Sequence, residues 1–247
     1  MEADDARCVF ADGAESGRAG LRLALPHRFA ASRLSLRVMP RLAFAAVFAL
    51  AAAATGCETT PALSAYEQGV LQARFDRDMA LRDPSRSVLD PAVRRQFTGL
   101  RYFDVDTTLR FRVPLVREAR AETVAVPLHL GGSDPYVRVG TVTMPMEGQP
   151  RRLAVYRPVS GPAVYWVPFR DATSGRATYG GGRYLYPDAR GDTLEIDFND
   201  AHNPNCDYNP TLYNCALPPS ENRLAVPVRA GEKRSLLVET DTTGAGA

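Results

Sequence analysis

Short runs of alternating apolar and polar residues dominate the chain after Leu100. Successive side chains of a strand point to opposite faces, so this period of two is typical of half-buried β-strands. Clusters of Gly, Pro, Asp and Ser separate the runs, and no helical stretch alternates with them. We therefore expect a mainly β fold, an antiparallel sandwich or barrel of about nine or ten short strands, and not a doubly wound α/β fold. The runs are LRFRV, TVAVPLHL, YVRVGTVTM, LAVYR, VYWVPF, RYLY, TLEIDF, LAVPV and SLLVE.

One longer helix is expected before this β region. Ser64 and Glu67 form an S-x-x-E capping box at its start, and it ends before the Asp-Pro pair at residues 83–84. A four-residue spacing gives it one apolar face, made by Leu71, Phe75 and Met79. A second, short helix is expected in DPAVRRQFTG, which has an Asp N-cap, a Pro in the first turn and a Gly beyond the last.

The N-terminal part contains an export signal. RLAFAAVFALAAAATGC, residues 41–57, has a positive residue, about thirteen apolar residues and a small-residue pair before a cysteine. This layout resembles the lipobox of bacterial lipoproteins, which implies that Cys57 receives a diacylglycerol and becomes the mature N-terminus. An ordinary signal peptide with a chance cysteine and a transmembrane anchor are the alternatives, although the run is short for a stable spanning helix.

This signal divides the chain and places it in the cell. Glu58, and not Asp, follows the cysteine, which by the enterobacterial sorting preference suggests the outer membrane, with the domain facing the periplasm. The expected segments are an extension upstream of the true start (1–38), the signal peptide (39–56), a tether (57–62), a single β-rich domain (63–240) and a flexible tail (241–247).

The number and spacing of the charged residues argue against a basic surface that binds nucleic acid. Residues 1–56 hold 7 of the 30 basic and 5 of the 28 acidic residues, so 23 of each remain in the mature chain. Lys233 is the one lysine, and the arginines are not clustered. We therefore expect a membrane contact through the lipid and a small-molecule or envelope partner, and no nucleic-acid partner.

A long segment without periodicity, residues 197–228, carries Cys206 and Cys215. In an oxidising compartment an even pair of cysteines predicts a disulfide, which closes a loop of about ten residues and contributes roughly 2–3 kcal/mol. The prolines of the segment lack donors for a sheet, and its asparagines favour turns. We therefore expect an ordered lobe held together by this bond.

Other chemistry at the cysteines is less favoured. His202, Cys206 and Cys215 have the spacing H-x3-C-x8-C, but zinc sites prefer a C-x2-C knuckle and reduced sulfurs. His202 is also the nearest base for a cysteine nucleophile. The chain has no G-x-S-x-G elbow, and His129 is expected on a strand. We expect no metal or cofactor.

A glycine run, Gly180 to Gly182, follows PFRDATSG and precedes RYLY. It lacks the Lys-Ser/Thr of a phosphate-binding loop and lies between two strands, which favours a hairpin with glycines at positive φ. The carboxylates and arginines around it suit either a buried structural network or a pocket for an anion.

The two motif-rich stretches, FRDATSGRATYGGGRYLY and DFNDAHNPNCDYNPTLYNCALPPSENRL, resemble an uncharacterised bacterial and archaeal domain, unknown-function family 1684. The resemblance covers most of residues 65–240 and implies no agreed activity. Asn205 stands where the family has a second proline, and His202 where an aromatic residue is common. The candidate ligand or catalytic residues that match the motifs are Arg170, Asp171, Arg183, Asp197, Asn199, Glu221, Asn222 and Arg223.

These observations favour a binding or structural domain of the cell envelope. An enzyme, such as a hydrolase with an Asp/Glu/Arg pocket, is the alternative, and it requires these side chains to converge. Partner recognition through the proline-rich ALPPSEN segment is a third hypothesis.

Overall fold

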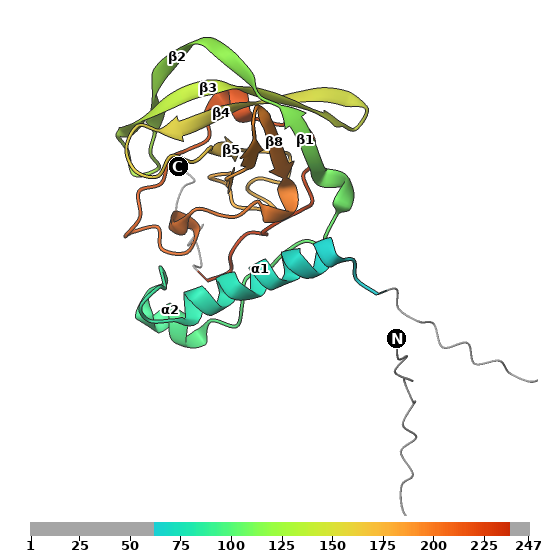
Figure 1. Ribbon diagram of the computed structural model, residues 1–247. Helices are drawn as coiled ribbons and strands as arrows, with labels where there is room; N and C mark the ends of the chain where they lie inside the picture. Colours follow the sequence, from blue (N-terminus) through green and yellow to red (C-terminus); the bar gives the residue numbers. More distant parts are fainter. Residues whose placement is uncertain (1–61, 238–247) are drawn as a thin grey trace, which may run out of the picture. The chain divides into compact units, whose positions relative to one another are not determined.

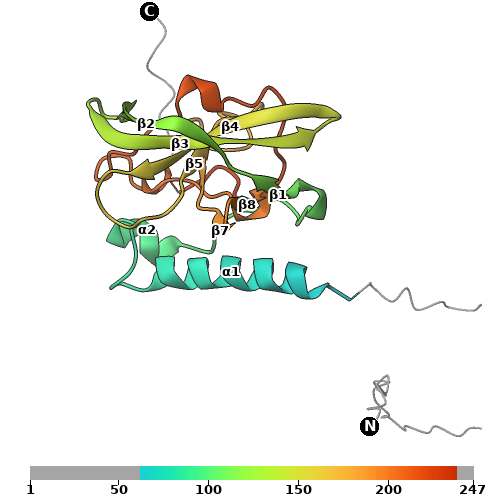
Figure 2. The same cartoon turned by 45° about the horizontal axis from the view of Figure 1, so that its top comes forward.

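A computed structural model describes residues 62–237. Its eight strands form three open antiparallel sheets, ordered β1-β8-β7, β2-β3-β4 and β5-β6 (Figures 1 and 2). The mainly β prediction is confirmed, but the described residues form no closed barrel. The strands are β1 Arg110–Pro114, β2 Val116–Pro127, β3 Ser133–Met146, β4 Gln149–Pro158, β5 Val167–Phe169, β6 Arg183–Leu185, β7 Asp188–Arg190 and β8 Thr193–Asp197. The helices are α1 Ala65–Arg82, α2 Pro91–Gln96 and the 3-10 turns η1 Thr107–Leu109, η2 Phe198–Asp200, η3 Asn205–Asp207 and η4 Ser220–Asn222.

The longest strands form the sheet β2-β3-β4. A two-residue turn joins β3 to β4, and Glu147 (φ 51°) and Gly148 (φ 70°) both have the positive φ that such a turn requires. Gly140 in β3 lies so close to β2 that a Cβ would approach the Val116 carbonyl oxygen to 2.3 Å. The inward side chains of β3 and β4 pack on β5, β6 and β8. The core they share includes Val142, Met144, Leu153, Val155, Val167, Phe169, Leu185, Leu194 and Ile196.

One expected strand is extended but forms no β-ladder. Residues 224–230 alternate between buried and exposed side chains, as the sequence predicts, and Leu224, Val226 and Val228 reach the core. The first residues of this segment bond through the backbone to residues 170–172, and side chains replace a neighbouring strand further on. The Val228 N–H donates to Asp171 Oδ2 at 2.6 Å, and Arg183 donates to the Val228 carbonyl at 2.9 Å. The described part of SLLVE, residues 235–237, is also not a strand. Seven of the expected runs are thus strands, and the short strand at Asp188–Arg190, which the alternation does not predict, brings the number among the described residues to eight.

The helices begin and end as predicted. Ser64 and Glu67 make the reciprocal capping box of α1, and Asp90 caps α2, where the Ala92 N–H donates to its side chain. The apolar face of α1, however, does not pack on the domain. The side chains on this face remain largely exposed: Leu71 at 42%, Phe75 at 56% and Met79 at 44%. The buried apolar residues of the helix are Val70 and Leu81, which share a different side.

The lobe that follows β8 is ordered and joined by the predicted disulfide. Cys206 and Cys215 are bonded, with their Cα atoms 6.0 Å apart. The lobe is held to the sheets by backbone pairs, such as those of Tyr184 with His202 and of Leu128 with Ala216. It therefore lies beside β6 and the end of β2.

Several expectations fall outside the described residues. These are the extension 1–38, the signal peptide 39–56, the lipidation site Cys57 and the tail 241–247. Within residues 62–237, no helix combines the length and hydrophobicity needed to cross a bilayer.

Candidate functional site

The motif residues Asp171 and Arg183 form a buried ion pair in the core. Arg183 Nη2 lies 3.3 Å from Asp171 Oδ2, and the Arg183 guanidinium lies 5.0 Å from the Phe169 ring centre. Burial lowers the pKa of Arg183 to about 10, so it remains charged at neutral pH. The Thr173 hydroxyl donates to the same carboxylate at 2.8 Å. Protein groups surround the ion pair, and the pair holds the segment at residues 224–230 in place.

A second group of motif residues joins η4 to the strands. The buried Asn222 amide donates to the carbonyls of Ala154 and Pro168 at 2.9 and 2.7 Å, and its oxygen accepts from the Ala154 N–H at 2.7 Å. Glu221 next to it is partly exposed and pairs with Arg138 at 3.0 Å. Arg170 and Arg223 meet through a backbone bridge between their segments, and Arg223 is exposed.

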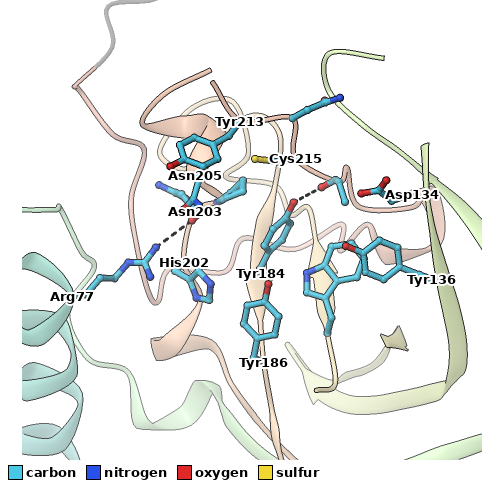
Figure 3. A pocket seen from close by; sticks show the side chains of 14 residues that line it. Arg77, Asp134, Tyr136, Tyr184, Tyr186, His202, Asn203, Asn205, Tyr213 and Cys215 are labelled. Carbon is cyan, nitrogen blue, oxygen red and sulfur yellow. Dashed lines mark hydrogen bonds between the residues drawn. The ribbon is translucent and has the colours of Figure 1, made fainter. Parts of the chain in front are cut away.

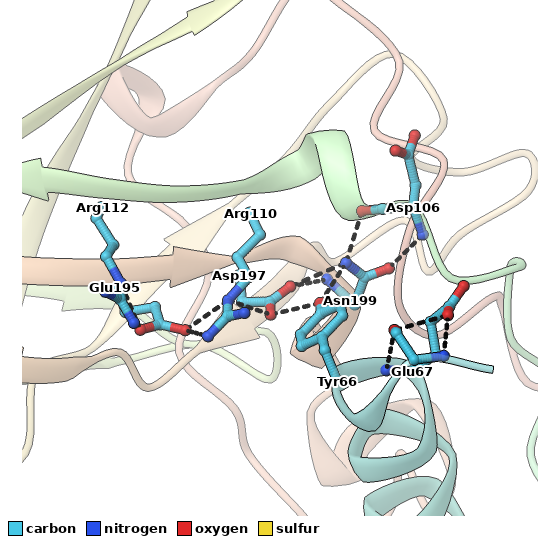
Figure 4. Close-up of polar contacts among 9 residues, drawn as sticks. Tyr66, Glu67, Asp106, Arg110, Arg112, Glu195, Asp197 and Asn199 are labelled. Atoms are coloured by element: carbon cyan, nitrogen blue, oxygen red, sulfur yellow. Dashed lines mark hydrogen bonds and ion pairs between the residues drawn. The ribbon is translucent and has the colours of Figure 1, made fainter.

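The third group fixes the start of α1 to the end of β8 (Figure 4). Tyr66 donates to Asp197 Oδ2 at 2.6 Å, and the Asn199 amide donates to the Tyr66 oxygen at 2.9 Å. Asn199 also exchanges two hydrogen bonds of 2.8 Å with the backbone of Asp106. Arg110 lies 3.6 Å from Asp197. The eight residues chosen from the sequence thus occupy three separate clusters and do not meet in one pocket.

An aromatic pocket of about 320 Å³ lies between β6, the disulfide lobe and the edge of the β2-β3-β4 sheet (Figure 3). None of the eight residues lines it. Its walls are Arg77, Asp134, Tyr136, Trp166, Tyr184, Tyr186, His202, Asn203, Pro204, Asn205, Tyr213, Asn214, Cys215 and Ala216.

The rings of this pocket are held in two stacked pairs. Tyr136 stacks on Trp166 with ring centres 4.4 Å apart, and Tyr186 stacks on His202 at 5.5 Å. Tyr184 stands edge-on to Trp166 at 5.1 Å and separates the pairs, and its hydroxyl donates to the Ala216 carbonyl. Trp166 is buried, whereas Tyr186 is 51% exposed and presents a ring to solvent. Fixed aromatic rings of this kind give a ligand apolar contact area at low entropic cost.

His202 is neutral in this pocket. Burial and the positive charge of Arg77 lower its pKa to about 4. Its Nδ1 lies 3.1 Å from the Asp200 carbonyl, which can only accept, so Nδ1 carries the proton. Nε2 is then an acceptor. The histidine offers a ligand one acceptor and one aromatic face.

Asn203 connects the pocket wall to a buried carboxylate. Its amide nitrogen donates to Glu232 Oε1 at 3.0 Å and to Asp207 Oδ2 at 2.8 Å, while its Oδ1 is buried without a hydrogen-bond partner. Tyr208 donates to Glu232 at 2.5 Å. Burial raises the pKa of Glu232 to about 7. Glu232 itself does not line the pocket, and a wall of stacked rings with the His202 acceptor suits the binding of a polar ring more than it suits acid–base chemistry.

The structure places a different histidine beside the sulfurs than the sequence spacing suggests. His129, and not His202, lies with Cys206 and Cys215 in a group whose ligand atoms are within 4.8 Å of one another. The Cys215 N–H donates to His129 Nδ1 at 3.1 Å, so Nε2 carries the proton and donates to the Pro210 carbonyl at 3.2 Å. The histidine thus holds the disulfide lobe against the end of β2.

Sequence reasoning singled out His202 and Cys215 of this pocket only for metal or cysteine chemistry, and it missed the tyrosines and the tryptophan. Tyr184 and Tyr186 lie in the RYLY run, which predicts a strand, and Trp166 and Tyr136 lie in other strand runs. The density of aromatic residues in these runs was a usable signal. No sequence pattern indicated that Glu232 would be buried, because its burial depends on the fold of the distant residues Tyr208 and Asn203.

Comparisons with known proteins give a family and a fold relative. The family model described as "Protein of unknown function (DUF1684)" matches residues 95–233. The solution NMR structure of an uncharacterized protein of Haloarcula marismortui is similar at 32% identity and a TM-score of 0.54, over 69% of this chain and 95% of that chain. No curated protein matches the chain.

Proposed function

Because the chain belongs to the DUF1684 family, whose match contains every residue of the aromatic pocket except Arg77, we propose that it is a ligand-binding protein of the cell envelope. In this proposal a lipid on Cys57 anchors the domain, and the aromatic pocket holds a small ligand with a flat apolar face and polar edges. The observation that carries the proposal is the stacking of the exposed Tyr186 ring on His202, whose Nε2 is an acceptor, in the wall of one cavity.

A sugar ring is the ligand class that fits this chemistry best. The C–H face of a pyranose packs on an aromatic ring, and its hydroxyls donate to an acceptor such as His202 Nε2. Asp134, Asn205 and Asn214 supply further hydrogen-bonding groups in the pocket wall. The one formal positive charge that lines it, Arg77, is shared with Glu232 at 3.7 Å, so a neutral ligand is favoured over an anion.

Trp166 makes the binding test direct, because it is the one tryptophan of the chain and lines the pocket. We expect neutral saccharides, with N-acetylhexosamine oligomers as the first probes, to change its fluorescence in a saturable way. Tyr186→Ala should weaken binding by roughly five- to tenfold, since a lost stacking contact is worth about 1–1.5 kcal/mol. Leu212→Ala is the matched control, since Leu212 is exposed near the rim and does not line the pocket. A saccharide and small-aromatic panel that leaves both fluorescence and melting temperature unchanged would argue against a binding pocket.

The lipid anchor is tested separately. In a bacterial host, the chain should incorporate an alkyne-tagged fatty acid and fractionate with membranes, and Cys57→Ala should abolish both. Export with cleavage but without lipid would support the ordinary signal peptide instead.

A further inference from the structure

One face of helix α1 exposes large apolar side chains to solvent, and Leu63, which precedes the N-cap Ser64, adds another. We name Leu63, Leu71, Phe75 and Met79 the α1 apolar strip; these side chains are 49%, 42%, 56% and 44% exposed. In both views α1 lies along the outside of the domain, on the side opposite the β2-β3-β4 sheet (Figures 1 and 2). A row of large apolar side chains on one exposed face is a feature of interaction sites.

Polar contacts explain why the helix has this orientation. Tyr66 is bound to Asp197, Arg74 donates to the Phe103 carbonyl at 2.9 Å, and Arg77 donates to the Tyr208 oxygen at 3.1 Å. These side chains fix one face of α1 on the domain, so the strip must point outward. The exposure is therefore built into the packing.

The strip borders a second apolar surface. A groove of about 620 Å³ runs between α1 and residues 100–105, and Leu63, Leu71 and Phe75 form one side of it. Leu100, Phe103 and Val105 contribute to the other side. The charged side chains of Glu67, Arg74, Asp78 and Asp104 also line this groove, so the apolar surface of the strip lies beside a groove of mixed character.

The chain that precedes α1 identifies the occupant of this face. Leu63 follows Cys57 by six residues, and six residues span at most about 21 Å when fully extended. A lipid on Cys57 thus holds the strip within reach of a bilayer surface. Gln68 and Gln72 next to the strip are neutral. The charges around the strip and in the groove, Glu67, Arg74, Asp76, Asp78, Arg82 and Asp104, have both signs and no basic excess, so apolar insertion and not attraction to anionic lipid would drive the contact.

We propose that α1 lies on the membrane surface with its apolar strip inserted at the boundary between headgroups and acyl chains. The proposal rests on the lipid anchor proposed above. An amphipathic helix of this kind enters about 5–10 Å into the interface, and the second contact supplements the acyl chains. It also fixes the domain's orientation, with the β2-β3-β4 sheet directed away from the bilayer.

The test measures the depth of the strip in the lipidated full chain, reconstituted into phosphatidylcholine vesicles that contain brominated lipid. In Phe75→Trp we expect a blue shift and a loss of fluorescence beyond that of the parent protein, whose Trp166 is buried. Leu130→Trp, at an equally exposed position on the β2–β3 turn, is the matched control and should behave as the parent. Replacing a third of the lipid with an anionic one should leave the quenching unchanged.

Three results would overturn the proposal. Equal quenching of the two tryptophan variants in vesicle-bound protein would show that the anchor holds while the strip stays in water. Strip-dependent dimers in the absence of vesicles, broken by Phe75→Glu, would assign the face to a second copy of the chain. Absence of lipid on Cys57 would remove the anchor and this inference together, and the labelling experiment above detects that case by itself.

Discussion

Arg183 and Asp171 form an ion pair at 3.3 Å in the core, where their side chains are 1% and 0% exposed. Their remaining hydrogen bonds go to the backbone and to hydroxyl groups, and with them they replace a missing β-ladder beside residues 224–230. Two residues of the strongest sequence motif thus hold the fold together in the place where the sequence pattern predicted a strand.

Neutralising one partner should therefore be costly. We expect Asp171→Asn to lower the free energy of unfolding by about 3–5 kcal/mol, because it leaves the Arg183 charge buried without its partner. The exposed Asp188→Asn should change it by less than about 0.5 kcal/mol. Denaturant unfolding measures both, and equal effects would mean that the ion pair contributes no specific stability.

The buried carboxylate of Glu232 should make stability depend on pH. Its pKa rises from 4.5 in the unfolded chain to about 7 in the fold, so the folded state binds the proton more tightly. Its favourable contribution is complete below pH 4.5 and is lost as the pH rises through about 7. Glu232→Gln keeps the shape without titrating. We expect this variant to gain stability relative to the parent across this range, by at most about 3 kcal/mol. Urea unfolding of both proteins from pH 4 to pH 8 measures the difference, and a constant difference would contradict the prediction.

The glycine run contains a matched pair of positions. Gly182 has a φ of +97°, and a Cβ there would lie 2.5 Å from Pro218 Cγ and 2.8 Å from the Phe169 carbonyl oxygen. Gly182→Ala should therefore cost about 2–4 kcal/mol. At Gly180 the nearest atom to a Cβ is 3.5 Å away, so Gly180→Ala should be nearly neutral. Thermal melts of the two variants are the measurement. An unchanged melting temperature in Gly182→Ala would show that Phe169 and Pro218 can move away from this position without a loss of stability.

The disulfide should stabilise the lobe through the unfolded state. Its sequence separation of 9 residues corresponds to about 3 kcal/mol of loop-closure entropy. Reductant should lower the guanidinium midpoint of the parent protein, while the double variant with Cys206→Ala and Cys215→Ala should already be lowered and insensitive to reductant. An unchanged midpoint in reduced parent protein would indicate that packing alone orders the lobe.

The sequence predicted the parts of this protein that depend on neighbouring residues. Alternation identified the strands, the Ser64–Glu67 pair located the start of α1, and the cysteine count gave the disulfide. These features depend on local backbone geometry or on composition, and both can be inferred from a single sequence. The same rules chose Asp171, Arg183, Asp197 and Asn222 as site residues because motif residues of these types often do chemistry.

The tertiary structure alone decided what those residues do. It buried Asp171, Arg183 and Asn222 as substitutes for backbone pairing, and it brought Tyr136, Trp166, Tyr184, Tyr186 and His202 into one cavity from four separate segments. It also turned the apolar face of α1 outward, because the polar contacts of Tyr66, Arg74 and Arg77, together with the burial of Val70 and Leu81, hold another face of the helix on the domain. Local pattern determines which face of an element is apolar. Which face packs against the domain depends on the partners that long-range contacts supply.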